Sequence, residues 1–243
     1  MKKLSDAELE VKSLQDLQTI IIKAKKWKIK LAVIGGYAVQ AHTKAYRLTK
    51  DIDLVITREA LWKFEGLLRE SGYTLRETEF GIAGSKPFNE GFIDIHVSVG
   101  KIFDMSSSIT YPVSQELFTN AKELKITGYY EASKQLACSA PVIDLETLLL
   151  LKLIPTGRGK DTVDILALLL DKREEIQLAN LVSKIKENIA LRRHLISQLR
   201  SYAEFVRKGE AAKLWFNITG SRIPATERRE ILKFIRKMVD ALR

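Results

Sequence analysis

The sequence has 243 residues, of which 46% are hydrophobic and 29% charged, so it can bury the core of one or two compact domains. With 13 glycines and 5 prolines it is neither a low-complexity nor a disordered chain. The formal net charge is +10, and residues 141–243 carry +7 of it, which favours an anionic partner such as nucleic acid, a nucleotide or a phosphorylated acceptor. A solvated cationic helix surface would explain the same charge.

The sequence carries no sign of membrane insertion or export. No apolar run approaches the ~18–20 residues that a membrane-spanning helix needs, and the charged N-terminal sequence has no apolar segment typical of a signal peptide. Cys138 is the single cysteine, which excludes an internal disulfide framework and a multi-cysteine metal site. These features predict no membrane contact and a cytoplasmic location, where thiols stay reduced.

Helical and strand-like patterns alternate through the first part of the chain. The first ~25 residues have the apolar spacing of an amphipathic helix. Residues 31–34 form a short apolar run that Gly35-Gly36 ends, which predicts a strand, a sharp turn and a short helix over residues 37–42. A second strand and a helix are expected at residues 52–56 and 58–70. Further strand-like segments lie near residues 73–77, 80–83, 92–98 and 123–127.

From Asp144 onward the pattern becomes helical. The expected helices are residues 145–153, 161–170, 178–206 and 227–242. This change predicts an α+β protein with two domains. The first, over residues 1–140, is a small mixed-sheet α/β domain with an N-terminal helix, and the second, over residues 141–243, is helical.

Two aspartates on one expected strand are the first candidates for chemistry. In the segment Asp51-Ile52-Asp53-Leu54, side chains two residues apart share a face, so the two carboxylates point the same way while Ile52 and Leu54 point toward the core. Adjacent carboxylates repel, and a hard divalent ion such as Mg²⁺ relieves that repulsion with oxygen ligands. An ordinary edge strand whose aspartates face water has the same pattern.

Two further features favour the metal site. Gly35-Gly36 closes one strand and opens a helix, which lets a phosphate chain approach the backbone N–H groups at a helix N-terminus. Asp94 lies on a hydrophobic strand between Ile93 and Ile95, where a carboxylate is costly unless its face is open. Three carboxylates on two neighbouring strands beside a Gly-Gly turn predict a two-metal phosphoryl-transfer site.

The sequence resembles a known family in two blocks. The first block is Gly35-Gly36-Tyr37-Ala38, 14 residues between Gly36 and Asp51, then Arg47-x-Thr49-x-Asp51-Ile52-Asp53 and the later Asp94. It resembles the DNA polymerase β-like nucleotidyltransferase superfamily, and within it the AbiEii/AbiGii toxin-like minimal nucleotidyltransferases. The second block is Asp144-Leu145-Glu146, Leu151-Lys152-Leu153 and Gly157-Arg158-Gly159-Lys160-Asp161-x-x-Asp164. The resemblance covers roughly residues 30–170, and Tyr37 departs from it, because many superfamily members carry Ser there.

The resemblance implies a role for each matching residue. Asp51 and Asp53 would hold Mg²⁺, or Mn²⁺, on the phosphates of an NTP, and Asp94 would bind a second ion or act as base toward the attacking hydroxyl. The residues that would bind the nucleotide are Gly35, Gly36, Arg47, Thr49, Lys152, Arg158 and Lys160. Asp161 and Asp164 share a helix face and would either orient these cations or pair at the surface.

The implied activity is that of a magnesium-dependent nucleotidyltransferase, which transfers an NMP from an NTP to an acceptor hydroxyl. The implied partners are the NTP, an RNA (including tRNA) or protein acceptor, and a cognate antitoxin if the chain is the toxin of a toxin–antitoxin pair. A non-catalytic nucleotide- or RNA-binding protein with the same fold is the alternative. Residues 175–243 match no motif.

Overall fold

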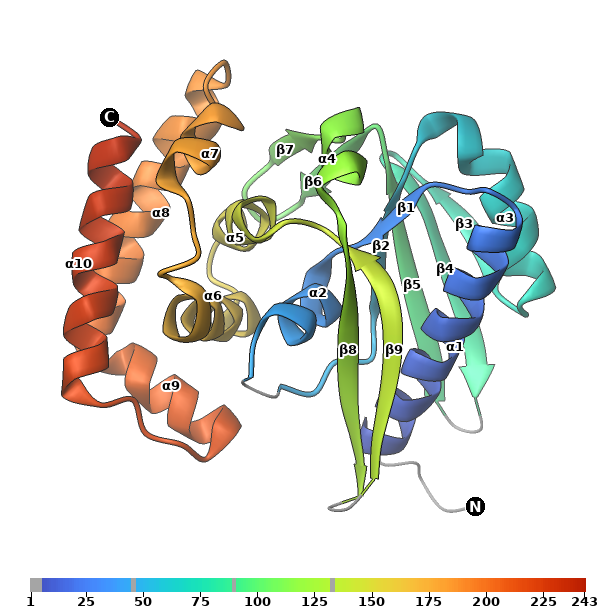
Figure 1. Cartoon of the computed structure of the whole chain (residues 1–243), viewed down its shortest axis with the longest axis horizontal. Helices are drawn as coiled ribbons and strands as arrows, with labels where there is room; N and C mark the ends of the chain where they lie inside the picture. Colours follow the sequence, from blue (N-terminus) through green and yellow to red (C-terminus); the bar gives the residue numbers. More distant parts are fainter. Residues whose placement is uncertain (1–5, 45–46, 89–90, 132–133) are drawn as a thin grey trace. The chain divides into compact units, whose positions relative to one another are not determined.

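The computed structural model describes residues 6–44, 47–88, 91–131 and 134–243 of the chain (Figure 1). The chain folds into two compact units. The first comprises residues 1–41, 48–103 and 111–144, and the second comprises residues 42–47, 104–110 and 145–243. Residues 42–47 and 104–110 therefore belong to the second unit, although the residues on both sides of each segment belong to the first unit. The domain boundary at residues 140/141 stays a proposal.

The N-terminal part of the chain alternates helices and strands as its apolar periodicity changes. Its elements are α1 (Asp6–Lys26), β1 (Leu31–Val33), α2 (Gly35–His42), β2 (Ile52–Ile56), the 3₁₀-helix η1 (Arg58–Ala60), α3 (Leu61–Glu70), β3 (Thr74–Thr78), β4 (Gly81–Phe88), β5 (Gly91–Val99), β6 (Lys101–Asp104), β7 (Ile109–Pro112), α4 (Gln115–Asn120), β8 (Lys122–Glu131) and β9 (Lys134–Val142).

The strands in the described part form one mixed sheet in the order β3-β4-β5-β2-β1-β9-β8, with β6 paired to β5 and β7 paired to β6. The short central strand β1 is fully buried and runs antiparallel to β2 and parallel to β9. Strand β2 pairs in parallel with β5, with Ile52 opposite Ile95 and Asp53 opposite His96. The two strands that carry the candidate carboxylates are therefore neighbours, as the sequence predicted.

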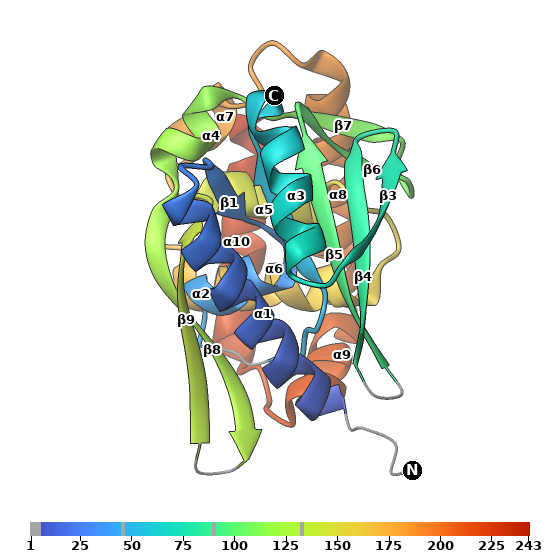
Figure 2. The same ribbon diagram turned by 90° about the vertical axis from the view of Figure 1, so that its right-hand side faces the viewer.

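One face of this sheet is packed and the other carries polar side chains. Helices α1 and α3 lie side by side against the packed face, as Figures 1 and 2 both show. Along β5, the buried residues Ile93, Ile95 and Val97 alternate with Asp94 and His96, which are partly or fully exposed. Because successive side chains on a strand point to opposite faces, Asp94 and His96 lie on the face away from the buried row.

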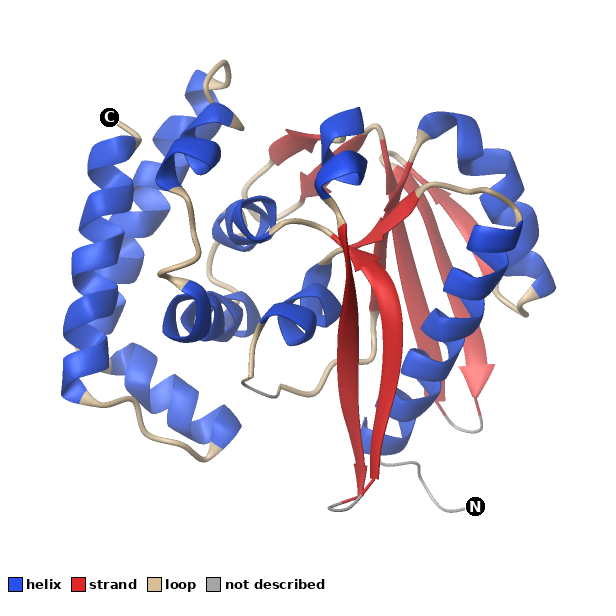
Figure 3. Cartoon of the chain, viewed as in Figure 1, coloured by secondary structure: helices blue, strands red, loops and turns tan. Residues whose placement is uncertain are grey.

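From Leu145 onward the chain contains helices only (Figure 3). They are α5 (Leu145–Leu153), α6 (Gly159–Lys172), α7 (Leu178–Ser183), α8 (Ile189–Arg207), α9 (Glu210–Thr219) and α10 (Ala225–Ala241). Helices α8 and α10 pack along each other through apolar rows spaced three to four residues apart. No helix in the described ranges is both long and apolar enough to cross a membrane.

The predicted α+β class, a mixed sheet followed by helices, is confirmed. The continuous helix expected over residues 178–206 is wrong, because α7 ends at Ser183 and α8 begins at Ile189. The side chain of Asn188 accepts a hydrogen bond from the Leu191 N–H at 2.9 Å, which caps the new helix. The sequence reasoning also missed five elements, namely β6, β7, β9, α4 and α9.

Candidate functional site

The turn between β1 and α2 brings Gly35 into direct contact with Asp53. Gly35 has a φ of +68°, a conformation that other L-residues rarely adopt. A Cβ atom at this position would lie 2.0 Å from Oδ2 of Asp53 and 2.7 Å from its Cβ. The Ile34 N–H donates to the Asp53 carbonyl at 3.0 Å, which fixes the two strands at this point. Only a glycine therefore allows the Asp53 carboxylate to lie against the turn.

The three candidate carboxylates belong to one face of two paired strands. Asp51 and Asp94 each precede the first residues of the β2–β5 pairing, Ile52 and Ile95, by one position. Asp53 is opposite His96 and has a partly exposed side chain. The period of two along each strand places all three carboxylates on the polar face.

His96 is the one basic side chain that contacts these carboxylates among the residues that the structure describes. Its Nδ1 lies 3.4 Å from Oδ1 of Asp53. The hydrogen bond to Asp53 raises the pKa of His96 above its ordinary value, burial opposes the rise, and the charges of Asp53, Asp51 and Asp94 add to it. All three carboxylates therefore act electrostatically on one imidazole.

The donor set suits a hard divalent cation. Across residues 6–44, 47–88, 91–131 and 134–243, neither Lys nor Arg forms an ion pair with Asp51, Asp53 or Asp94. Three carboxylates without a paired cation repel one another, and oxygen donors of this kind are the usual ligands of Mg²⁺. Within the same ranges, no three acidic, His or Cys side chains already converge closely enough to hold a metal ion.

The segment that leads into Asp51 is held by a buried glutamate. Glu10 on α1 has no exposed surface, and its Oε1 accepts hydrogen bonds from the Thr49 N–H at 3.0 Å and from the Gln40 side chain at 3.1 Å. On the same helix, the Ser13 hydroxyl accepts a hydrogen bond from the Tyr37 hydroxyl at 2.9 Å. Thr49 itself is buried. Helix α1 thus fixes both α2 and the backbone two residues before Asp51.

The second unit contains a balanced group of six charged side chains, which we name the ionic cluster. Its members are Arg47, Asp104, Lys152, Arg158, Asp161 and Asp164. Three are basic and three acidic, so their formal charges cancel. They come from the segment before β2, the end of β6, α5 and the start of α6.

Lys152 lies at the centre of the ionic cluster. Its Nζ is 2.8 Å from Oδ2 of Asp164 and 3.0 Å from Oδ1 of Asp161, and its side chain is only 10% exposed. Burial works against the charged form of Lys152, but Asp164 and Asp161 outweigh it and raise the pKa of Lys152. Burial likewise opposes ionisation of Asp164, but Lys152 and Arg47 outweigh it and lower the pKa of that carboxyl.

The two arginines of the ionic cluster differ in exposure. Arg47 forms a two-pronged contact with Asp164, with Nε to Oδ1 at 2.7 Å and Nη2 to Oδ2 at 3.0 Å, and is 14% exposed. Arg158 is 56% exposed and places Nη1 3.4 Å from Oδ2 of Asp104. Its Nε is 3.0 Å from Oδ2 of Asp161, but that oxygen receives no directed hydrogen bond, so the contact is one of charge alone.

These contacts settle the two alternatives for the acidic pair on α6. Asp161 and Asp164 are buried, so pairing at the surface is wrong. They lie against three of the cations that the resemblance assigned to the nucleotide, whereas Lys160 is exposed.

Gly36, the second glycine of the turn, is buried in the first turn of α2.

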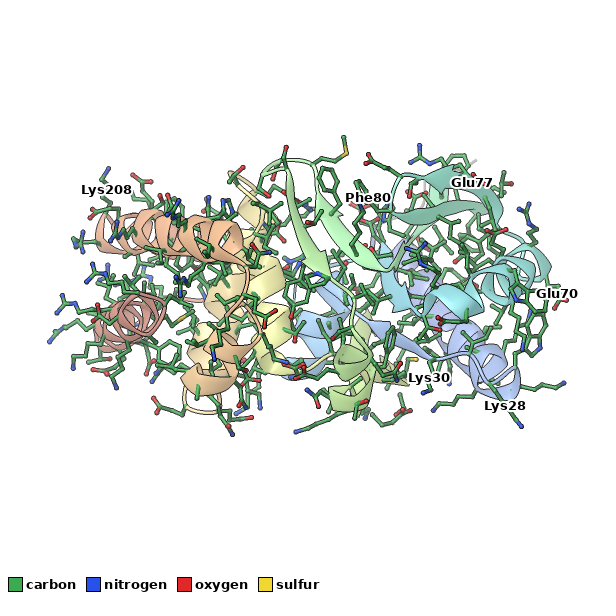
Figure 4. The ribbon with its side chains drawn as sticks, turned by 90° about the horizontal axis from the view of Figure 1, so that it is seen from above. Lys28, Lys30, Glu70, Glu77, Phe80 and Lys208 are labelled. Atoms are coloured by element: carbon green, nitrogen blue, oxygen red, sulfur yellow. The ribbon has the colours of Figure 1, made fainter. Side chains whose placement is uncertain are left out.

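A separate pocket of about 260 Å³ lies at the other end of β1 from Gly35. The residues that line it include Ile21, Ile29, Phe118 and Lys30, which is labelled in Figure 4. It contains none of the candidate residues and is distinct from the carboxylate site.

Two residues of this arrangement, Glu10 and Asp104, were missed in the sequence, and His96 was considered as a residue that could reach the site but was not assigned to it. Glu10 and Asp104 act through partners far away in the chain, so no local motif marks them. His96 shares a strand face with Asp94 by the period of two, which is a signal that the sequence does contain.

Comparisons with known proteins identify a family model and solved structures that are similar to this chain. A family model described as Nucleotidyl transferase AbiEii toxin, Type IV TA system, matches residues 17–242. The crystal structure of JHP933 from Helicobacter pylori is similar to this chain with a TM-score of 0.53 and 12% identity, over 99% of this chain and 95% of that one. A putative nucleotidyltransferase from H. pylori has a TM-score of 0.53 and 11% identity, over 98% and 97%. At these identities the likeness concerns the fold alone. No relative among curated proteins matches the sequence.

Proposed function

We propose a mechanism and an acceptor for this chain, which belongs to the AbiEii family of nucleotidyl transferase toxins and is therefore a nucleotidyltransferase. This membership confirms the family that the two motif blocks predicted. In the proposed reaction an acceptor hydroxyl oxygen bonds to the α-phosphorus of an NTP. The bond from the α-phosphorus to the bridging oxygen breaks, and pyrophosphate leaves with its electron pair.

Asp51, Asp53 and Asp94 are the proposed metal ligands, with Mg²⁺ as the ion and Mn²⁺ as an alternative. The observation that carries this assignment is the close contact of the Asp53 carboxylate with Gly35, on the sheet face shared with the other two carboxylates. A bound divalent ion would neutralise phosphate charge and polarise the phosphoryl group. Asp94, on the neighbouring strand, is also the proposed base that takes the proton of the attacking hydroxyl.

The glycine turn is the proposed cradle of the triphosphate. The first N–H groups of α2 have no acceptor within the helix, and a phosphate at Gly35 and Gly36 would satisfy them. Thr49, whose backbone Glu10 holds, would shape the approach to Asp51. Of the cations assigned to the nucleotide, Arg158 and Lys160 are exposed, and we assign the charge of the leaving pyrophosphate to them.

RNA, including tRNA, is the proposed acceptor. Residues 184–243 carry 15 Lys and Arg against 6 Asp and Glu. Arg193, Arg200 and Arg207 recur every seven residues on α8 and are exposed, and the Lys208 side chain points outward at the end of that helix (Figure 4). A basic row of this kind favours a phosphate backbone over a neutral acceptor. A cytoplasmic location and a toxin role opposed by a cognate antitoxin stay predictions.

The proposed function is tested by incubating the protein with each α-³²P-labelled NTP, Mg²⁺ and total cellular RNA. We expect label to enter RNA with one or more nucleotides, and the labelled RNA species then identifies the acceptor. The Asp51→Asn/Asp53→Asn variant should transfer no label, because it removes two of the three metal ligands.

Two controls separate the parts of the proposal. EDTA in place of Mg²⁺ should abolish the transfer. Label on protein would overturn RNA as acceptor but keep the nucleotidyl transfer, and equal labelling by the double variant would overturn the metal assignment.

A further inference from the structure

The basic residues of the ionic cluster differ in exposure. Lys152 and Arg47 are 10% and 14% exposed, whereas Arg158 is 56% exposed. We propose that Lys152 and Arg47 are positioning residues, and that Arg158 is the cation of the cluster that stays available to an anionic ligand such as the triphosphate. This inference rests on the proposed function and assigns Lys152 a role other than the phosphate contact that the family resemblance implied.

Lys152 has its donors directed at carboxylates of its own chain. Its ammonium group is within 3.0 Å of both Asp161 and Asp164, on a helix whose other residues are mostly buried leucines. To bind a phosphate, Lys152 would leave two buried carboxylates without their cation, which is a large penalty in a low-dielectric interior. Its charge is therefore used to hold α5 and α6 together.

Arg47 is held in the same way by Asp164. The two parallel N–H contacts at 2.7 and 3.0 Å occupy the side of the guanidinium that would otherwise chelate a phosphate. Arg47 precedes Thr49 by two residues, and the Thr49 N–H is fixed by Glu10. Asp164 and Glu10 thus restrain both ends of a three-residue segment that continues into Asp51 and Asp53.

Arg158 is oriented by the cluster but remains open to solvent. Asp104 receives hydrogen bonds on Oδ1 from the Ser107 N–H at 2.9 Å and from the hydroxyls of Ser106 and Ser107, and its Oδ2 faces Arg158. The side chain of Arg158 is more than half exposed, and its Nη2 has no acceptor among the residues that the structure describes. A guanidinium fixed on one edge and free on the other is suited to an anion.

The charge balance of the cluster provides the test. Lys152→Met leaves one excess negative charge in the interior, and Asp161→Asn leaves one excess positive charge. The double variant restores neutrality, with Asp164 still paired to Arg47 and Arg158 to Asp104. Melting temperatures without nucleotide should fall by about 10 °C for Lys152→Met, and the double variant should recover at least half of that loss. If Lys152→Met does not fold but the double variant does, the double variant has likewise recovered stability, and the result supports the balanced cluster.

Nucleotide affinity distinguishes positioning from contact. In titrations of NTP with Mg²⁺, the double variant should regain affinity together with stability. Arg158→Gln should weaken binding tenfold or more, and its melting temperature should fall less than that of Lys152→Met because the Arg158 side chain is more than half exposed. Lys213 is exposed on α9, so Lys213→Gln is the matched control for loss of one surface cation. This variant should bind the NTP as tightly as the wild type does.

Each contrary result has a distinct meaning. A double variant no more stable than Lys152→Met overturns the balanced cluster. A double variant that is stable but binds NTP tenfold more weakly than the wild type places Lys152 on the triphosphate and overturns its positioning role. A wild type that shows no Mg²⁺-dependent NTP binding overturns the proposed function, and with it the Arg158 assignment, while the melting temperatures still report on the cluster.

Discussion

The Asp53 carboxylate occupies the space that a side chain at Gly35 would need, because Oδ2 of Asp53 lies 2.0 Å from the position of a Cβ atom on Gly35. This contact joins the two motifs that are most informative in the sequence, the Gly-Gly turn and the aspartate pair. It also places a carboxylate directly beside the N-terminus of α2, where a triphosphate and its metal ion would meet.

Gly35→Ala should therefore damage both the fold and the site. A residue with a Cβ at φ +68° costs about 1–2 kcal/mol, and the overlap with Asp53 adds to that cost. We expect a lower free energy of unfolding and a loss of tenfold or more in Mg²⁺-dependent NTP affinity, because Asp53 must move. Urea unfolding and calorimetry measure the two effects.

Gly159→Ala is the matched control for this substitution. Gly159 begins α6, has no positive φ, and a Cβ there would meet no atom within 4 Å. The variant should keep or slightly raise the stability of the wild type. Equal damage by both substitutions would contradict the special role of Gly35.

Glu10 should matter for stability although it lies far from the motif in sequence. Glu10→Ala leaves the buried Thr49 N–H without its acceptor, which costs about 1–3 kcal/mol. Glu10→Gln retains an acceptor oxygen and should cost less. Amide hydrogen exchange at Thr49 should become faster in Glu10→Ala and much less so in Glu10→Gln.

The exposed Glu77 on β3 points outward (Figure 4) and provides the control. Glu77→Ala should change the free energy of unfolding by less than about 0.5 kcal/mol. If Glu10→Ala is equally mild and leaves Thr49 exchange unchanged, Glu10 does not hold the segment before Asp51.

The ionic cluster should make stability fall in acid. Burial opposes ionisation of Asp104, but hydrogen bonds from Ser106 and Ser107 and the charge of Arg158 outweigh it and lower its pKa below the ordinary value of 3.8. A lowered carboxyl pKa stabilises the fold above the ordinary value, and this stabilisation is lost as the pH falls through the pKa of the folded state. Asp104→Asn should thus be less stable than the wild type at neutral pH, with a gap that closes in acid as the pH falls below the ordinary carboxyl value of 3.8.

Urea unfolding at both pH values measures this gap. The exposed Asp240→Asn on α10 is the control, and its difference from the wild type should be small at neutral pH and in acid. A gap for Asp104→Asn that is the same at both pH values would mean that the Asp104 charge does not stabilise the fold.

The sequence predicted those parts of the site that depend on local pattern. The apolar run before Gly35-Gly36, the short helix after it and the strand at residues 52–56 are all present as β1, α2 and β2. The period of two along a strand was enough to place Asp51 and Asp53 on one face and to put Asp94 on a neighbouring strand. These inferences succeed because side-chain direction on a strand follows from backbone geometry alone.

The contacts between distant segments could not be predicted. The sequence left open whether Asp161 and Asp164 orient the motif cations or pair at the surface, and only the structure shows that the ammonium group of Lys152 contacts both carboxylates. Similarly, Glu10 is one of several acidic residues at the start of α1, and only the packing of α1 against the segment before β2 shows its partner. The break at Asn188 did have a local signal, the preference of Asn for helix N-caps.

The central claim is that the carboxylates beside Gly35 bind a divalent ion on which nucleotide binding depends. The most direct test is calorimetric titration of a non-hydrolysable NTP analogue into the wild type and Asp53→Asn, each with and without Mg²⁺, with Asp240→Asn as the control. We predict that Mg²⁺ strengthens binding tenfold or more in the wild type and the control but not in Asp53→Asn, which should keep a native melting temperature. An equal gain from Mg²⁺ in a folded Asp53→Asn, or no gain in the wild type, would contradict the claim.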